Sequence, residues 1–205
     1  MGKNLVRALV PVTFMVATWI LWELGGGEVG TREALRGTAR IAFLPFILAF
    51  VARPLDDLRS SAFSRWLVAN RKTLGVSFGL SLSIHLWLIL WLFYLSAPSV
   101  PDAVTLTDLS IGAPGLAFVF AMVFTSMNRV RASMSAVLWK RIHTFGQYLV
   151  WFIFVGCLTE SFGHKSPPYS ALEYTPFIGA LFIAMGIRLG AGLFGPNGRF
   201  SQKTA

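Results

Sequence analysis

The sequence predicts an all-α integral membrane protein, a single domain of six transmembrane helices over residues 1–205 with both termini in the cytoplasm. Hydrophobic residues make up 55% of the chain and charged residues only 13%, whereas an average soluble domain has about 25% charged residues. The mean hydropathy is +0.63. The net charge of +9 comes from basic residues at the ends of apolar runs. This is a membrane pattern, so nucleic acid is not an expected partner.

Six apolar segments approach the roughly 20 residues that a membrane span needs. The second and fifth are short, and we expect them to extend by a turn at either end. Glycine and proline mark the breaks between segments, as at residues 25–27 and at Arg53-Pro54. The first segment ends in large residues and not in a cleavage site, which favours a retained helix over a signal peptide. The segments are residues 5–24, 37–51, 73–95, 109–128, 144–158 and 175–194.

The distribution of lysine and arginine predicts the orientation, because cytoplasmic loops are enriched in both. With the N-terminus inside, 14 of the 18 basic residues lie on the inner side. The outer side keeps Arg32, Arg36, Arg40 and Lys165. This asymmetry favours an even number of spans, both termini in the cytoplasm, and a multi-pass protein of the plasma (inner) membrane in contact with the lipid bilayer.

Ionisable residues inside the spans are candidate site residues, because each costs at least about 2.5–3.5 kcal/mol in hydrocarbon. His85 lies deepest, on the third segment, and His143 lies at the inner mouth of the fifth. Arg40 and Arg188 lie on the second and last segments, and both could instead snorkel to the surface. His143 could instead contact lipid head groups, and His85 could be a neutral imidazole bonded to a neighbouring helix.

The chain has no motif for binding a nucleotide, neither a P-loop nor a dinucleotide fingerprint. We therefore expect no flavin or NAD(P) site in it, and any oxidoreductase activity would need a partner chain. Its single cysteine excludes an intramolecular disulfide, and no Cys/His cluster has zinc spacing. A neutral imidazole among apolar helices is a usual axial ligand of b-type haem, so histidines on two different helices suggest haem.

Three blocks of sequence carry a resemblance to a known family. They are residues 71–78 with 84–86, residues 139–148, and the stretch from 38–40 to 53–55. Over residues 36–157 the chain resembles the ferric reductase-like transmembrane family, which includes the haem membrane subunit of the periplasmic methionine sulfoxide reductase system. The resemblance implies a six-helix bundle that holds haem b between its third and fifth helices and passes electrons across the membrane.

The resemblance also implies redox partners and candidate ligands. The electron donor would be a quinone or a flavoprotein, and the acceptor a soluble reductase on the outer side. His85 would be the leading candidate haem ligand and His143 the next candidate. Arg40, Arg71 and Arg141 would face haem propionates or quinone head groups.

The histidine set departs from the family pattern, in which two histidines 13–14 residues apart lie on each of the two helices. Arg71 stands 14 residues before His85, and Gly156 and Cys157 stand 13 and 14 residues after His143. If Arg71 and Arg141 mark the same inner boundary, the two histidines differ in height by 12 residues, or about 18 Å. We therefore do not expect them to clamp one haem together.

Three alternatives remain open for the haem. An outer haem could be held by His85 with either Cys157 or His164 as the second ligand. An inner haem could be held by His143 opposite Arg71. Finally, the chain could have kept the fold and lost the haem, as a non-catalytic membrane scaffold or partner protein.

Overall fold

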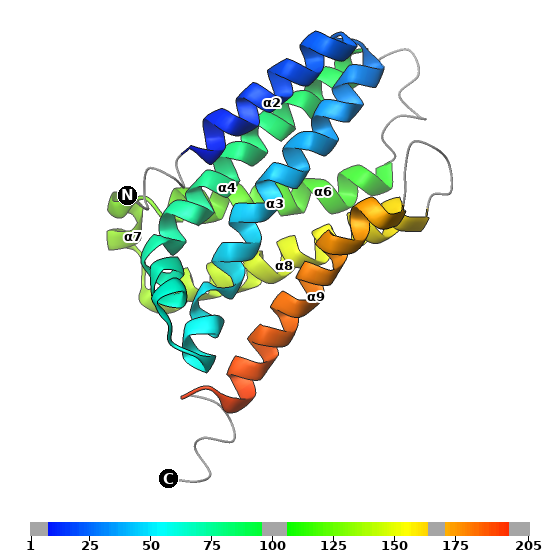
Figure 1. Ribbon diagram of the computed structural model, residues 1–205. Helices are drawn as coiled ribbons and strands as arrows, with labels where there is room; N and C mark the ends of the chain where they lie inside the picture. Colours follow the sequence, from blue (N-terminus) through cyan, green and yellow to red (C-terminus); the bar gives the residue numbers. More distant parts are fainter. Residues whose placement is uncertain (1–7, 96–105, 164–170, 197–205) are drawn as a thin grey trace. The chain divides into compact units, whose positions relative to one another are not determined.

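The structure, a computed structural model, describes residues 8–95, 106–163 and 171–196 (Figure 1). In this part of the chain the regular structure is entirely α-helical, as predicted, and each of the six predicted segments overlaps a long helix. The helices are α2 (Leu9–Leu24), α3 (Glu28–Leu58), α4 (Ala62–Leu95), α6 (Leu106–Thr125), α7 (Asn128–Ser133), α8 (Ala136–Gly163) and α9 (Ala171–Phe194).

Four of these helices, α3, α4, α8 and α9, are long and apolar enough to cross a membrane. Helix α2 and the Gly112–Thr125 part of α6 are shorter apolar helices. The two segments that are short in sequence extend as expected, and by more than a turn, since α3 has 31 residues and α8 has 28.

The predicted break at Arg53-Pro54 is wrong, because α3 continues through Pro54 to Leu58. A proline inside a helix removes one N–H donor but need not end the helix when the freed carbonyl finds another donor. The turn comes later, where Ser61 and Ser64 cap the start of α4 reciprocally. Ser64 N donates to Ser61 Oγ at 3.1 Å, and Ser61 N donates to Ser64 Oγ at 2.8 Å.

The chain forms two compact units. The first consists of Met1–Phe46 and Lys72–Met134, and the second of Ile47–Arg71 and Ser135–Ala205. Helices α2, α6 and α7 therefore belong to the first unit and α8 and α9 to the second, while α3 and α4 contribute a part to each.

In the first unit, α2, α3 and α4 run side by side (Figure 1). Their buried residues Ala17, Ala34 and Leu88 form one apolar cluster. A hydrogen bond of 3.0 Å between the hydroxyls of Thr13 and Ser81 joins α2 to α4. Polar pairs of this kind hold helices together in lipid, where the hydrophobic effect does not.

Helix α6 packs closely on α4 in the same unit at Gly79. A Cβ atom built at Gly79 would overlap the Val123 side chain, whereas one at Gly75 meets nothing within 4 Å. Of these two glycines, Gly79 is therefore the one that lies at the close contact between α4 and α6.

Aromatic residues gather where α2 turns into α3 and α4 ends. Gly25, with a φ of 80°, closes α2, and the Trp91 indole donates to the Gly26 carbonyl at 3.0 Å. Trp91 stacks between Trp87 and Tyr94. Tryptophan and tyrosine concentrate at membrane–water interfaces, so this end of the unit has the composition of such an interface.

In the second unit, α8 and α9 pack against each other (Figure 1). The buried Trp151 indole donates to the Leu181 carbonyl at 3.0 Å, and its ring meets Phe182 edge-on at a centroid distance of 6.2 Å. One tryptophan thus joins the two helices by both a hydrogen bond and a ring contact.

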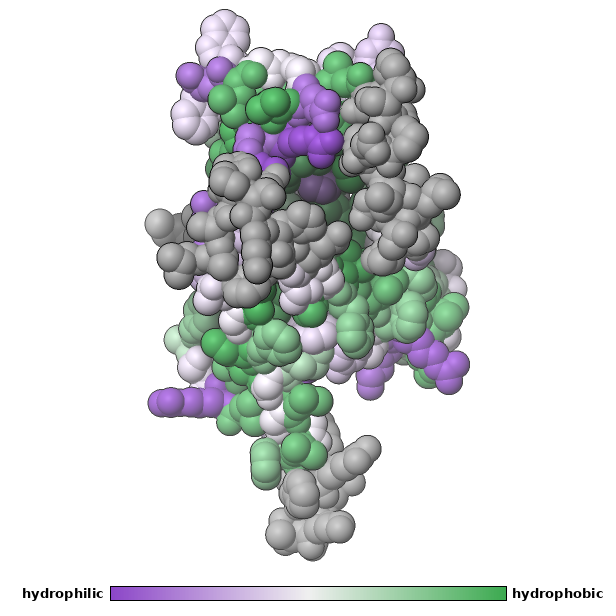
Figure 2. All heavy atoms as spheres, turned by 90° about the vertical axis from the view of Figure 1, so that its right-hand side faces the viewer, coloured by the Kyte–Doolittle hydropathy of each residue, from purple (hydrophilic) through white to green (hydrophobic). Residues whose placement is uncertain are grey.

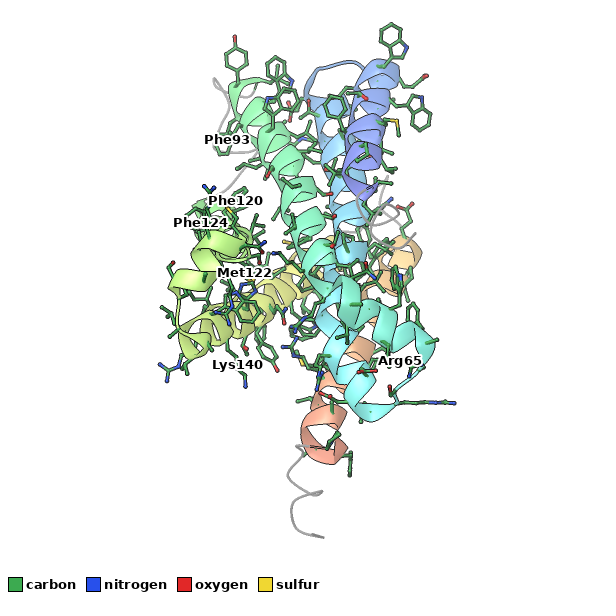
Figure 3. All side chains as sticks on the ribbon, turned by 90° about the vertical axis from the view of Figure 1, so that its left-hand side faces the viewer. Arg65, Phe93, Phe120, Met122, Phe124 and Lys140 are labelled. Atoms are coloured by element: carbon green, nitrogen blue, oxygen red, sulfur yellow. The ribbon has the colours of Figure 1, made fainter. Side chains whose placement is uncertain are left out.

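The helices expose large apolar side chains, and hydrophobic residues cover much of the surface in Figure 2. Trp22 is 85% exposed and Phe152 63%. On α6, Phe120 and Phe124 lie next to each other, 37% and 59% exposed (Figure 3). Such surface is costly in water but suits contact with lipid tails.

Candidate functional site

His85 lies on the inward face of α4, one turn from the buried residues Ser81 and Leu88. Its Nδ1 is 3.0 Å from the hydroxyl oxygen of Thr38 on α3, and Thr38 itself is fully buried. His85 is therefore hydrogen-bonded to a neighbouring helix within the first unit. This is the alternative in which His85 is an imidazole bonded to another helix.

The environment of the Thr38 hydroxyl favours one tautomer of His85. The hydroxyl oxygen lies 2.9 Å from the Ala34 carbonyl oxygen and 3.0 Å from that of Leu35. Carbonyl oxygens only accept, and a hydroxyl has one proton to give. If Thr38 gives that proton to a carbonyl, its oxygen accepts from Nδ1–H of His85. In this neutral tautomer the lone pair that can bind a metal is on Nε2.

Arg40 belongs to the same unit, two residues beyond Thr38 on α3, and is half-buried. Arg36, one turn before it, forms a salt bridge with Glu33. The N-terminal half of α3 thus carries arginines close in sequence to the threonine that contacts His85.

His143 lies on α8 in the second unit, and its ring stacks on that of Trp139 with a centroid distance of 4.1 Å. Lys140 and Arg141 of the same turn are exposed. This group of one aromatic and three basic or titratable side chains has the composition of a membrane-interface segment.

Arg71, in the N-terminal part of α4, and Arg188, on α9, meet at a glutamine of α8. Arg188 Nη1 donates to the side-chain oxygen of Gln147 at 2.9 Å, and Arg71 Nη2 donates to the same oxygen at 3.3 Å. Side chains of α4 and α9 therefore donate to one neutral acceptor on α8 within the second unit.

Arg188 also contacts α3 and a second residue of α8. Its Nη1 donates to the Phe50 carbonyl at 3.2 Å. Its guanidinium lies over the rings of Phe50 and Tyr148, at 4.3 and 4.7 Å from their centroids. Such cation–π contacts stabilise a guanidinium that has lost its water. These contacts hold the Arg188 guanidinium against α3 and α8 within the second unit.

Among the described residues, neither Arg71 nor Arg188 forms a salt bridge with a carboxylate. Arg188 and Arg53, whose charges act on Arg71, are also positive. We call Arg71, Gln147, Tyr148 and Arg188 the arginine cluster. It is a partly buried, positively charged group whose polar contacts are all to neutral atoms.

The remaining candidates lie elsewhere. Cys157 is on the exposed side of α8, and His164 lies outside the described residues. In the described ranges no group of three or more His, Cys, Asp or Glu side chains could hold a metal ion. A haem iron needs only one or two axial ligands from the protein, so this finding leaves His85 and His143 as ligand candidates.

The predicted site residues therefore divide between the two units. His85 and Arg40 belong to the first, whereas Arg71, Arg141, His143 and Cys157 belong to the second. Thr38 and Gln147 are site residues that were not predicted from the sequence, although both lie in the blocks that carry the family resemblance. The sequence did mark both positions in one way. Each is an uncharged polar residue in an apolar stretch, near the candidate residue Arg40 or His143.

A sequence profile described as the ferric reductase like transmembrane component matches residues 36–157, more than half of the chain. Comparison with curated proteins gave no match, and neither did comparison with solved structures. Together with the long apolar helices, the family match establishes an integral, multi-pass membrane protein.

Proposed function

The chain belongs to the ferric reductase-like transmembrane family, and we propose that it is a haem b-dependent oxidoreductase subunit that passes electrons across the membrane to an outer acceptor. When bound, haem supplies one-electron chemistry at its iron. The protein supplies the ligand, the surrounding polarity and the access route. The donor would be a quinone or a cytoplasmic flavoprotein, and the acceptor a soluble reductase on the outer side.

The contact between Thr38 and His85 carries this proposal. An axial histidine must present an unprotonated nitrogen and must be held in orientation, and a hydrogen bond to its other nitrogen achieves both. The Thr38 hydroxyl lies at Nδ1 of His85, 3.0 Å away, which leaves Nε2 to face the iron. His143 is the second candidate ligand, with one ring face covered by Trp139.

The arginines contribute positive charge toward negatively charged or electron-rich groups. Arg40 would serve a group bound in the first unit, and Arg71 and Arg141 a group bound in the second, as partners of haem propionates or quinone head groups. Arginine suits this role because its planar fork binds a carboxylate through two hydrogen bonds and stays protonated.

The proposed topology has six spans in the plasma (inner) membrane and both termini in the cytoplasm. Four spans correspond to α3, α4, α8 and α9, and α2 and α6 supply the remaining two. With this orientation the aromatic end of α4, at Trp91 and Tyr94, faces outward, and the Arg59–Ser61 turn faces inward.

The test is optical. Wild-type protein, purified from cells supplied with haem and reduced with dithionite, should show the Soret and α bands of a b-type haem. His85→Ala should abolish or shift these bands. His143→Ala should do so only if His143 also binds the haem iron. Arg65→Gln is the matched control, because Arg65 is exposed and projects away from the helices (Figure 3).

A folded, colourless wild-type preparation from haem-replete cells would refute the haem proposal. The chain would then be a haem-free member of its family, acting as a scaffold or partner for another membrane complex. Unchanged bands in His85→Ala would refute the ligand assignment alone, since haem would still be present.

A further inference from the structure

We infer that the arginine cluster binds an oxyanion, either the phosphate of a lipid head group or the carboxylate of a haem propionate. Only the alternative in which the oxyanion is a haem propionate rests on the proposed function. Its basis is the uncompensated charge of Arg71 and Arg188 and the arrangement of their donors around Gln147.

The first argument is the charge. Two guanidinium groups share one neutral oxygen, at 3.3 and 2.9 Å, and no carboxylate of the described residues pairs with either. Like charges repel, and each charge loses hydration when it is partly buried. An anion between or beside the two guanidinium groups would offset both the repulsion and the lost hydration. The cluster itself contains no anionic side chain.

The second argument is the supply of donors. A guanidinium carries five N–H groups. The hydrogen bonds of Arg188 to Phe50 and Gln147 both start from Nη1, Arg188 also forms a side-chain hydrogen bond with Tyr148, and the hydrogen bond of Arg71 starts from Nη2 alone. Nitrogens of both residues therefore remain to bind oxygen. Phosphate and carboxylate accept such donors in pairs, and these charge-assisted bonds are about twice as strong as neutral ones.

The third argument is the position of the cluster along its helices. Arg71 directly precedes Lys72 and the apolar part of α4. On α3, Phe50 is followed by Arg53, which pairs with Asp57 at 3.0 Å and has a 57% exposed side chain. The cluster thus lies where the apolar stretches give way to charged residues, which is the depth at which lipid phosphates occur.

Native mass spectrometry tests the lipid source. Delipidated protein would be titrated with dioleoyl-phosphatidylglycerol and, as the phosphate-free comparison, with dioleoylglycerol. We expect the wild type to retain the phosphate-containing lipid selectively. The variants Arg71→Gln and Arg188→Gln should weaken its binding by about tenfold or more, as expected for the loss of one charge-assisted contact. Arg65→Gln should leave it unchanged.

Gln147→Glu is the most discriminating variant, because it places a carboxylate between the two arginines without changing the size of the side chain. We expect it to raise the melting temperature of lipid-free protein and to abolish retention of phosphatidylglycerol. This variant should fold at least as well as the wild type, so it decides the matter even if an arginine variant does not fold.

A haem titration tests the propionate source. The apoprotein would receive either haem or haem dimethyl ester, whose propionates are esterified and uncharged. Weaker binding of haem to Gln147→Glu, with unchanged binding of the ester, would identify the propionate as the oxyanion.

If Gln147→Glu changes the binding of neither phosphatidylglycerol nor haem, the inference is wrong and the two arginines are structural. If the protein binds no form of haem, the proposed function fails, while the lipid titration still decides this inference.

Discussion

Arg188 Nη1 donates a hydrogen bond to the backbone carbonyl of Phe50, 3.2 Å away on another helix. In an uninterrupted helix that carbonyl would accept from the N–H of residue 54, but residue 54 is proline and has none. The arginine of α9 thus takes the place of the missing backbone donor of α3. This explains why α3 passes through Pro54 without a break.

Restoring the backbone donor should make Arg188 less important. We expect Arg188→Leu to destabilise the protein, and to do so by less when Pro54→Ala supplies an N–H for the Phe50 carbonyl. The coupling should be about 0.5–3 kcal/mol, the usual range for residues in contact. Unfolding of the two single variants and the double variant in detergent measures it. Strictly additive effects would show that the Phe50 contact contributes nothing.

Removing the Thr38 hydroxyl should release His85. Thr38→Val keeps the shape of the side chain but leaves Nδ1–H without its acceptor, so we expect a loss of about 1–3 kcal/mol in stability. Thr38→Ser keeps the hydroxyl and should therefore retain most of this stability. Thermal unfolding measures the stability, and the Soret spectrum reports the ligand's orientation if haem is bound. Equal behaviour of the valine and serine variants would contradict a role for the hydroxyl.

A methyl group at Gly79 should separate α4 from α6. Because its Cβ would overlap the side chain of Val123, which is stiff at χ1, Gly79→Ala should cost about 1–3 kcal/mol. Gly75→Ala, one turn earlier, enters open space and should be neutral or stabilising by up to about 1 kcal/mol. Melting temperatures of the two variants provide the comparison. A stable Gly79→Ala protein would show that α6 can move away without loss.

Membrane-impermeant thiol reagents should distinguish the two sides of the protein. In a Cys157→Ala background, a cysteine at Gly26 should be labelled while the plasma membrane is intact, because the α2–α3 turn faces outward in the proposed topology. Cysteines at Ser60 and Ala132 should be labelled only after the membrane is opened. All three positions are exposed. Labelling of Ser60→Cys from outside would reverse the orientation.

The positions of the helices followed from the sequence because lipid permits few alternatives to a continuous helix for an apolar run. Their ends did not follow as well. Helix α3 begins at Glu28, and its polar first turns are supported by the salt bridge between Arg32 and Glu28 at 2.7 Å. Hydropathy does not register such pairs, so the predicted segment began only at residue 37.

The candidate site was predictable in part. Charge and depth in the membrane identified His85 and Arg188 as candidate site residues, and the family resemblance added Arg71. Their partners depend on how each helix is rotated about its axis, and an apolar pattern on all sides of a helix leaves that rotation undetermined. Thr38 lies 47 residues from His85, and Gln147 lies 76 residues from Arg71.

The length of α4 has a consequence for the lipid around the protein. At 1.5 Å per residue, its 34 residues extend about 51 Å, whereas the hydrocarbon layer is about 30 Å thick. Tilting cannot absorb all of this difference, so about a dozen residues at the Ala62 end must extend beyond the tails. Arg65, Arg71 and Lys72 lie in this part of the helix, so the Ala62 end of α4 should lie among lipid head groups and water, which can solvate their charges.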